Sequence, residues 1–193
     1  MYFRYRSMWV LSFDIGVKNL AYCYACDAMI TKWGTLDISA DNIYLISKKC
    51  MIQLNEHFSD LEIDIVLLEN QPVQKNPKMK SIQMIVFGFF AYQRHISKRN
   101  IKHVLFQSAS NKNRYSNRFD LVVPEYKSKY IYNKKKAILC TKYILECDGA
   151  IEWIDYFNTH KKQDDLADSY LQLLHYIDYT PVLPNPPSPR TDS

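Results

Sequence analysis

The sequence predicts a mixed α/β domain: a sheet of five strands, three antiparallel and then two parallel, with helices on both faces. Two apolar runs at residues 9–13 and 20–25 follow each other closely, as in an antiparallel hairpin. A compact β-branched run at residues 64–68 is typical of a strand buried on both faces. Segments with helical spacing separate the later runs. With 193 residues, 47% of them hydrophobic, we expect one full core.

The first strand of the hairpin ends on a carboxylate. Asp14 follows the apolar run at residues 9–13, and Gly16 permits a backbone bend that a side chain would resist. A third antiparallel strand is expected within residues 30–38, which would complete a meander. Asp14 would then lie where a central strand turns toward its neighbour.

A helix and a fourth strand are expected next. Residues 41–58 keep a roughly helical spacing of apolar side chains, with Ser39 as the expected cap. Glu69 closes the strand at residues 64–68, immediately before Gln71 and Pro72 stop it. Glu69 is therefore a second carboxylate at a strand end.

The segment at residues 79–96 is predicted to be a helix buried on more than one side. Its apolar residues cover nearly the whole circumference around Gly88. The sheet can cover one side, and the other needs a second element or a second copy of the protein. We therefore expect this helix at the centre of a two-fold dimer interface, with Gly88 where two helices come close. A further strand is expected at residues 104–106.

A basic and aromatic stretch precedes the next helix. Residues 111–133 have little apolar periodicity and are expected to form a loop. Lys134, Lys135 and Lys136 then open a helix that ends near Gly149. Cations at a helix start oppose its dipole, so they indicate either a phosphate brought by a ligand or a solvated basic turn.

The last helix begins with acids, in the segment QDDLADSYLQLLHYI. Asp164 is expected to cap this helix, and Asp165 and Asp168 to project side by side from its first turn. Such acids also complement the helix dipole, which is the simpler reading of them in isolation. We expect one domain at residues 1–179 and a disordered proline-rich tail at 180–193.

Charge and cysteine content narrow the class of protein. The formal net charge of +5 favours an anionic partner. Five cysteines, an odd number, with no signal peptide ahead of them predict a reducing, intracellular setting. The longest apolar stretch, residues 84–92, is about half of what a bilayer requires, so no membrane span is expected.

Four acids at the strand ends and the helix start could meet in such a sheet: Asp14, Glu69, Asp165 and Asp168. Crowded carboxylates repel one another, and metal ions are the natural reason for such a group. Oxygen ligands with no His or Cys nearby predict Mg²⁺, which Mn²⁺ can replace. Two such ions can hold the attacking water and the leaving oxygen of a phosphodiester.

Four motifs in this order resemble those of one enzyme family. FDIGVKN, VLLENQP, NKKKAI and QDDLADSY are similar to the motifs of the poxvirus-type Holliday junction resolvases, relatives of RuvC in the ribonuclease H-like superfamily. The resemblance spans about residues 10–176. It implies a ribonuclease H-like fold and a Mg²⁺-dependent homodimeric endonuclease that makes paired nicks in four-way DNA junctions. It also implies a role at the site of viral DNA replication in an infected cell.

The resemblance also assigns roles to individual residues. It makes Asp14, Glu69, Asp165 and Asp168 the ligands of two metal ions, and Lys135 the active-site lysine, with Lys134 or Lys136 able to stand in. The long insertion before these lysines departs from shorter relatives. The basic residues expected to contact DNA are Lys18, Lys75, Lys78, Lys80, Lys112, Arg114, Arg118, Lys134 and Lys136.

Other functions are weighed against the same residues. Sugar kinases and actin-like ATPases share such a sheet, but their second phosphate loop is rich in glycine, and this chain has four glycines in all. No nucleotide cofactor is therefore expected. A junction-binding module without catalysis conflicts with four carboxylates, which would only weaken DNA binding without metal. A related nuclease for RNA–DNA hybrids or flaps stays open as the alternative.

Overall fold

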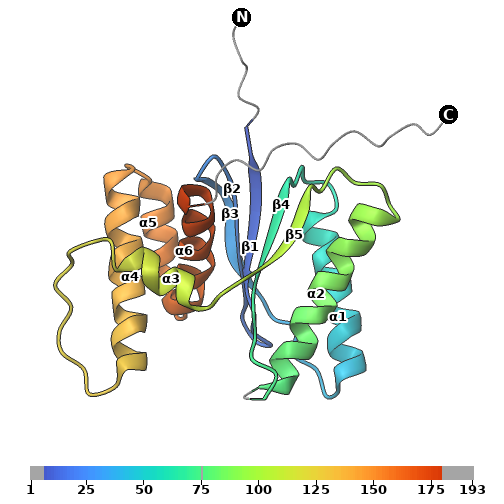
Figure 1. The fold of residues 1–193 in the computed structure, drawn as a ribbon, viewed down its shortest axis with the longest axis horizontal. Helices are drawn as coiled ribbons and strands as arrows, with labels where there is room; N and C mark the ends of the chain where they lie inside the picture. The colour runs from blue at the N-terminus through green and yellow to red at the C-terminus, as the bar shows by residue number, and fades with distance from the viewer. Residues whose placement is uncertain (1–6, 75, 180–193) are drawn as a thin grey trace, which may run out of the picture.

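A five-stranded sheet separates two layers of helices (Figure 1). The structure is a computed structural model, which describes residues 7–74 and 76–179; the tail at 180–193 lies outside the described residues. The strands are β1 Trp9–Asp14, β2 Leu20–Cys26, β3 Met29–Leu36, β4 Ile65–Glu69 and β5 His103–Gln107. They lie in the order β3-β2-β1-β4-β5. The first three pair antiparallel, whereas β4 is parallel to both β1 and β5, which confirms the predicted mixed sheet.

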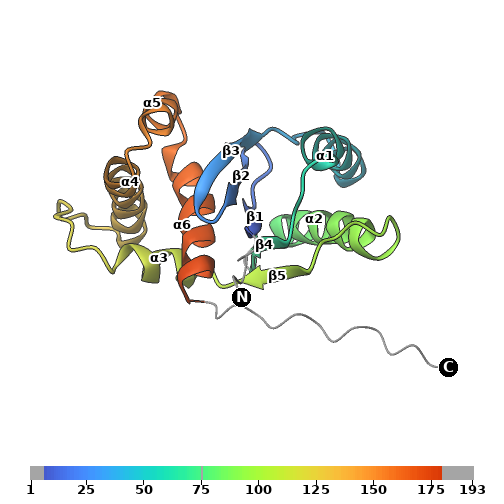
Figure 2. The ribbon, with the colours of Figure 1, turned by 90° about the horizontal axis from the view of Figure 1, so that it is seen from above.

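Helices cover both faces of this sheet. They are α1 Ile43–Phe58, α2 Pro77–His95, α3 Ser110–Ser116, α4 Lys129–Cys147, α5 Ile151–Thr159 and α6 Gln163–Tyr179. α1 and α2 lie on one face, and α3 to α6 lie on the other (Figures 1 and 2). α6 packs directly against β1 and β2, with α4 outside it.

Alternating residues of the strands belong to two separate hydrophobic cores, one on each face of the sheet. In β1, Val10 belongs to the core under α4 to α6, whereas Leu11 belongs to the core under α1 and α2. In β4, Leu67 likewise belongs to the core under α4 to α6, and Leu68 to the core under α1 and α2. Successive side chains of a strand point to opposite faces, so every second residue of these central strands faces α6.

α6 is held in register on the sheet by a buried amide. Gln172 donates from Nε2 to Ser12 Oγ at 2.9 Å and to the carbonyl oxygen of Phe13 at 3.2 Å. Trp33 on the edge strand β3 also donates, from Nε1 to the carbonyl oxygen of Leu166 at 3.1 Å. The Gln172 bonds fix the middle of α6 beside the end of β1, and the Trp33 bond ties its amino-terminal part to β3.

Two boundaries differ from the sequence expectation. The expected loop at residues 111–133 contains α3, where Tyr115 is buried, and α4 begins at Lys129. The three consecutive lysines therefore lie in the second turn of α4, and the prediction that they open the helix was wrong. Residues 117–128 form the remaining loop between α3 and α4.

Two predicted caps also differ. Asn42 caps α1 by accepting from the Leu45 amide at 3.0 Å, whereas Ser39 binds Asp37 in the preceding loop. Asp164 lies inside the first turn of α6, and its carboxylate binds Lys134. Across the described residues, none of the helices is both long and apolar enough to cross a membrane.

Candidate active site

Two acids lie at the carboxyl ends of adjacent parallel strands. Asp14 is the last residue of β1 and Glu69 the last of β4. By the alternation along each strand, Asp14 shares the face of Val10, and Glu69 shares the face of Leu67, which is the α6 face. Parallel pairing thus brings the two side chains together where open α/β sheets place ligands.

The other two acids come from the first turns of α6. Asp165 and Asp168 are three positions apart and therefore lie on one side of the helix. The contact of Gln172 with β1 directs this side toward Asp14. All four predicted acids line one pocket of about 520 Å³.

A lysine stands at the centre of this group. The Nζ atom of Lys112, on α3, lies 3.2 Å from Asp14, 3.1 Å from Glu69 and 2.5 Å from Asp168. Each of these side chains is less than 20% exposed, with Lys112 at 13%. The sequence assigned Lys112 to DNA contacts, but its ammonium forms three ion pairs inside the carboxylate pocket.

Crowding and burial shift the pKa values of these groups. Burial raises the pKa of Glu69 to about 9, helped by a hydrogen bond and the charge of Asp14 and opposed by Lys112. Burial also raises the pKa values of Asp165 and Asp168 to about 6, and nearby acids add to both shifts. Burial lowers the pKa of Lys112, but its three carboxylate partners outweigh this and hold it well above its ordinary value.

Short helix α3 is anchored at its far end, which positions Lys112. Tyr115 donates its hydroxyl to Asp178 on α6 at 3.0 Å. Arg118 pairs with the same carboxylate at 2.6 Å and lies over the rings of Tyr115 and Tyr179. This contact to α6 fixes α3 on the helix that also carries Asp165 and Asp168.

The three consecutive lysines have different environments. Lys134 lines the pocket, binds Asp164, and lies 4.9 Å from the ring centre of Tyr130. Lys135 is exposed and lies outside the pocket lining, and Lys136 is partly buried beyond it. Lys134 is therefore the member of the triplet that faces the four acids.

The other predicted DNA contacts fall on several elements. Lys18 follows β1 and Lys78 lies in the first turn of α2, and both are exposed, as is Arg114 on α3. Lys80 is engaged with Asn70 at 3.0 Å, and Arg118 holds Asp178. Lys75 lies outside the described residues.

The sequence missed the place of Lys112 because it lies 98 residues from Asp14 and in a segment without apolar periodicity. One signal was present: Lys112 follows the end of a predicted parallel strand. That strand end lies at the same sheet edge as Asp14 and Glu69.

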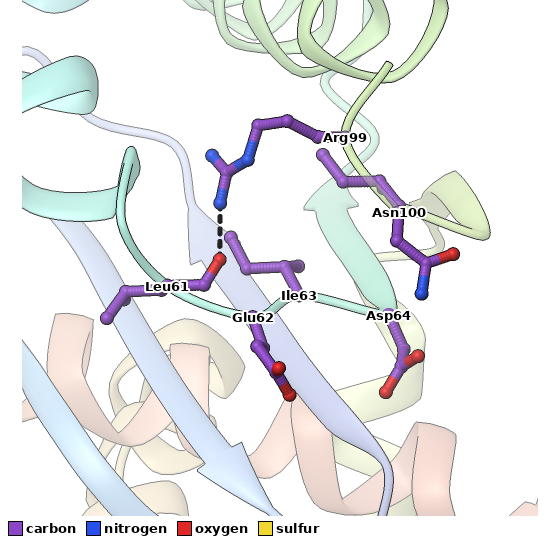
Figure 3. A pocket seen from close by; sticks show the side chains of 7 residues that line it. Leu61, Glu62, Ile63, Asp64, Arg99 and Asn100 are labelled. Carbon is purple, nitrogen blue, oxygen red and sulfur yellow. Dashed lines mark hydrogen bonds between the residues drawn. The ribbon is translucent and has the colours of Figure 1, made fainter. Parts of the chain in front are cut away.

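A second cavity, of about 200 Å³, lies at the opposite end of β4. Figure 3 shows Arg99 reaching across it to the carbonyl oxygen of Leu61. Asp64 accepts from the Trp9 amide at 2.9 Å and pairs with Lys102 at 3.0 Å. Arg99 and Asp64 are thus already bonded to the backbone or to Lys102 beside the start of β4. The cavity is therefore not the candidate site.

The carboxylate pocket has the donor set of a hard-cation site. Among the described residues, no three His, Cys, Asp or Glu side chains are arranged as a metal site, and Lys112 lies between three of the acids. The four acids nevertheless supply only oxygen donors, as Mg²⁺ and Mn²⁺ require. Burial is the largest cause of the raised pKa values of Glu69, Asp165 and Asp168, and a cation held by these oxygen atoms would favour the ionised acids.

Comparison of the sequence with known proteins gives one viral relative. An uncharacterized protein, L451 of Acanthamoeba polyphaga mimivirus, is 34% identical over 160 residues, which are 79% of this chain. The match spans only 37% of the length of that relative. No protein-family model matches the sequence.

Solved structures give a consistent fold. The yeast mitochondrial Holliday junction resolvase Ydc2 matches with a TM-score of 0.62 and 19% identity, over 90% of this chain and 80% of Ydc2. Fowlpox virus resolvase, in its complex with substrate Holliday junction DNA, matches with a TM-score of 0.55 and 19% identity. This match covers 88% of this chain and 97% of the fowlpox resolvase. Thermus thermophilus RuvC matches with a TM-score of 0.56 and 12% identity, over 88% of this chain and 95% of RuvC. The chain thus has the ribonuclease H-like fold of the RuvC-type Holliday junction resolvases.

Proposed function

We propose that this protein is a metal-dependent DNA endonuclease that resolves four-way junctions. One observation carries the proposal: Asp14, Glu69, Asp165 and Asp168 converge, from two strand ends and one helix, in a single open pocket. Two of the three structural neighbours described above are resolvases by name, and the one from fowlpox virus was solved with its substrate Holliday junction DNA. The viral relative supports a role in viral genome replication or recombination in an infected cell.

The four carboxylates would hold two Mg²⁺ ions, which Mn²⁺ could replace. When bound, such ions supply a water activated for attack on phosphorus and stabilise the departing 3′ oxygen. The products would carry 5′-phosphate and 3′-hydroxyl ends. Asp14 and Glu69 sit on central strands, so the sheet would fix these two ligands rigidly.

The basic side chains of the pocket would act on the phosphodiester. Lys134 is partly exposed at the pocket wall, and its ammonium could turn from Asp164 to a phosphate oxygen. A fixed cation there stabilises charge that develops in the transition state. We therefore propose Lys134 as the active-site lysine of the triplet, with Lys135 and Lys136 contributing to DNA affinity.

A homodimer would place one such pocket on each of two equivalent strands of a junction. The outer side of α2 suits this pairing, because Met84 and Tyr92 are exposed on either side of Gly88 at helical spacing. Tyr92 and Gly88 also line an apolar groove with Met51 and Ile52 on α1, which we call the α1–α2 groove. Large exposed apolar patches mark interaction sites.

A cleavage assay tests the proposal. A four-way junction labelled on each strand is compared with a linear duplex, a flap and an RNA–DNA hybrid, with and without Mg²⁺. We expect paired nicks at symmetric positions in the junction only, and only with Mg²⁺. Preferential cleavage of the flap or hybrid would replace the junction by another substrate, and Mg²⁺-dependent binding without cleavage of any substrate would overturn the nuclease assignment.

A further inference from the structure

The ammonium of Lys112 occupies the point where three carboxylates of the pocket meet. Its Nζ atom lies within 3.2 Å of oxygen atoms from Asp14, Glu69 and Asp168, which come from β1, β4 and α6. Lys112 itself comes from α3. One side chain thus joins four separate elements at the place where acids would otherwise repel one another.

Acidic side chains outnumber cations at this point. One ammonium faces three acids, and Asp165 lies in the same pocket. A buried charge is costly unless it is neutralised, so the group favours additional positive charge. A divalent cation would satisfy the same oxygen atoms more completely than the monovalent ammonium does.

We infer that Lys112 and a divalent metal ion are alternative occupants of this carboxylate cluster. In the metal-free protein, Lys112 holds the acids together; on metal binding, its ammonium leaves them and turns into the open part of the pocket. There it would meet the phosphate of a bound DNA strand. This inference rests on the proposed metal-dependent function, which it extends to the resting state of the site.

The surroundings of Lys112 allow such an exchange. α3 has seven residues, and its N-cap residue, Ala109, makes no side-chain capping hydrogen bond. The long, flexible stem of lysine can swing while the strands keep their places. The pocket, of about 520 Å³, is lined by Ala109 and Asn113 beside Lys112, which gives the ammonium space to move into.

Metal binding to a variant without this ammonium tests the exchange. Mn²⁺ affinity is measured by electron paramagnetic resonance for the wild type and for Lys112→Met, which keeps the apolar stem, in the full chain without DNA. Removing a cation that competes at a few ångströms should tighten Mn²⁺ binding by about tenfold or more. The melting temperature of Lys112→Met should fall without metal and rise more on Mg²⁺ addition than that of the wild type.

Lys102 provides the matched control. It also pairs with a buried carboxylate, Asp64, at 3.0 Å, but at the opposite end of the sheet. Lys102→Met should lower the melting temperature without changing Mn²⁺ affinity. Unchanged or weaker Mn²⁺ binding in Lys112→Met would overturn the exchange, since Lys112 would then be neutral toward the metal or would help to bind it.

A second measurement needs no variant and covers the case in which Lys112→Met does not fold. Wild-type protein is treated with an amine-acylating reagent, and modification of each lysine is followed by mass spectrometry with and without Mg²⁺. Modification of Lys112 should be slow without metal and accelerate several-fold with it, whereas that of Lys102 should not change. Equal or slower modification of Lys112 in protein saturated with metal would overturn the inference.

The outcome is separable from that of the cleavage assay. A protein that binds Mn²⁺, releases Lys112 and cuts no DNA would support the exchange and contradict the proposed nuclease. A protein that cuts junctions while Lys112 stays protected at saturating metal would support the proposed nuclease and contradict the exchange. A protein that binds no divalent metal would contradict both.

Discussion

Lys112 and Lys134 both line the carboxylate pocket, but their partners differ. Lys112 is buried among three acids, whereas Lys134 pairs with Asp164 at the pocket wall. Asp164 does not line the pocket, so Lys134 can exchange its partner for a phosphate without disturbing the four central acids. The two cations therefore should not be interchangeable.

A substitution series on the lysine triplet tests the role of Lys134. Lys134→Ala should slow the single-turnover cleavage rate about a hundredfold at saturating enzyme, as expected on losing a fixed transition-state donor. Lys135→Ala and Lys136→Ala, the matched controls, should mainly weaken salt-sensitive junction binding. A larger rate loss in Lys135→Ala would instead return the active-site role to that exposed residue.

The raised pKa values predict how the stability of the metal-free protein depends on pH. The pKa of Glu69 is about 9 in the folded protein, above its ordinary value of 4.5, with Asp14, Lys112 and Asp168 around it. A carboxyl whose pKa is raised stabilises the fold at low pH, and this contribution is lost as pH rises through the folded pKa. The difference in free energy of unfolding between the wild type and Glu69→Gln should therefore shift in favour of Glu69→Gln between about pH 5 and about pH 9. Urea unfolding at several pH values measures this difference, and a difference that does not change with pH would contradict the shift.

The acids and the cations were not equally predictable from the sequence. Asp14 and Glu69 end apolar runs, and Asp165 and Asp168 share a helix face, so local patterns fix where each acid lies. The place of Lys112 depends on how α3 folds back against α6 through Tyr115, a tertiary contact with no local pattern. The same holds for Lys134, whose orientation depends on where α4 begins.

At the scale of elements, α3 is the least independent part of the site. A seven-residue helix is too short to be stable alone, and no side chain caps its start. Its order therefore depends on the bonds of Tyr115 and Arg118 to Asp178. We expect these contacts, more than helix propensity, to hold Lys112 in the pocket.

Asp178→Ala should loosen α3 without unfolding the sheet. Hydrogen exchange of the amides at residues 111–117 should become faster, while exchange in β1 and β4 should stay slow. Asp155→Ala, at an exposed position of α5, is the matched control and should change neither segment. Unchanged protection of α3 in Asp178→Ala would show that the pocket itself holds this helix.

The spacing of apolar residues predicted most of the helices and strands, and the elements that it missed were missed for physical reasons. The strands and the helices α1, α2 and α6 carry apolar residues at the period of their structure, so their positions were predicted closely. The segment NKNRYS of α3 buries Tyr115 and Ser116 and has no apolar stripe. The first turn of α4 is exposed at Lys129, Tyr130 and Ile131, so the core does not mark where this helix begins.

At the scale of the molecule, the α1–α2 groove is the surface that a dimer would bury. Gly88 lies in it, and a Cβ atom added there would meet no atom within 4 Å. A larger side chain at this position would therefore leave the subunit itself undisturbed. Leucine also favours a helix over glycine by up to about 1 kcal/mol.

Gly88→Leu should separate the subunits of the proposed dimer while keeping or raising the melting temperature of each. Analytical ultracentrifugation measures the assembly, and junction products should change from paired to single nicks. Asp155→Leu is the matched control, because it adds the same side chain to an exposed position in the opposite layer of helices. It should leave the dimer and the paired nicks unchanged. An intact Gly88→Leu dimer with paired nicks would place the interface on another surface.

The most direct measurement of the proposed function records binding and cleavage of one four-way junction in parallel for four isosteric variants. They are Asp14→Asn, Glu69→Gln, Asp165→Asn and Asp168→Asn. Each variant removes a proposed metal ligand, so each should lower the single-turnover cleavage rate at least about a hundredfold. Junction affinity, measured in Ca²⁺, should stay within a few-fold of the wild type. Near-normal cleavage by the Asp14, Glu69 or Asp168 variant would contradict a nuclease centre built on these carboxylates.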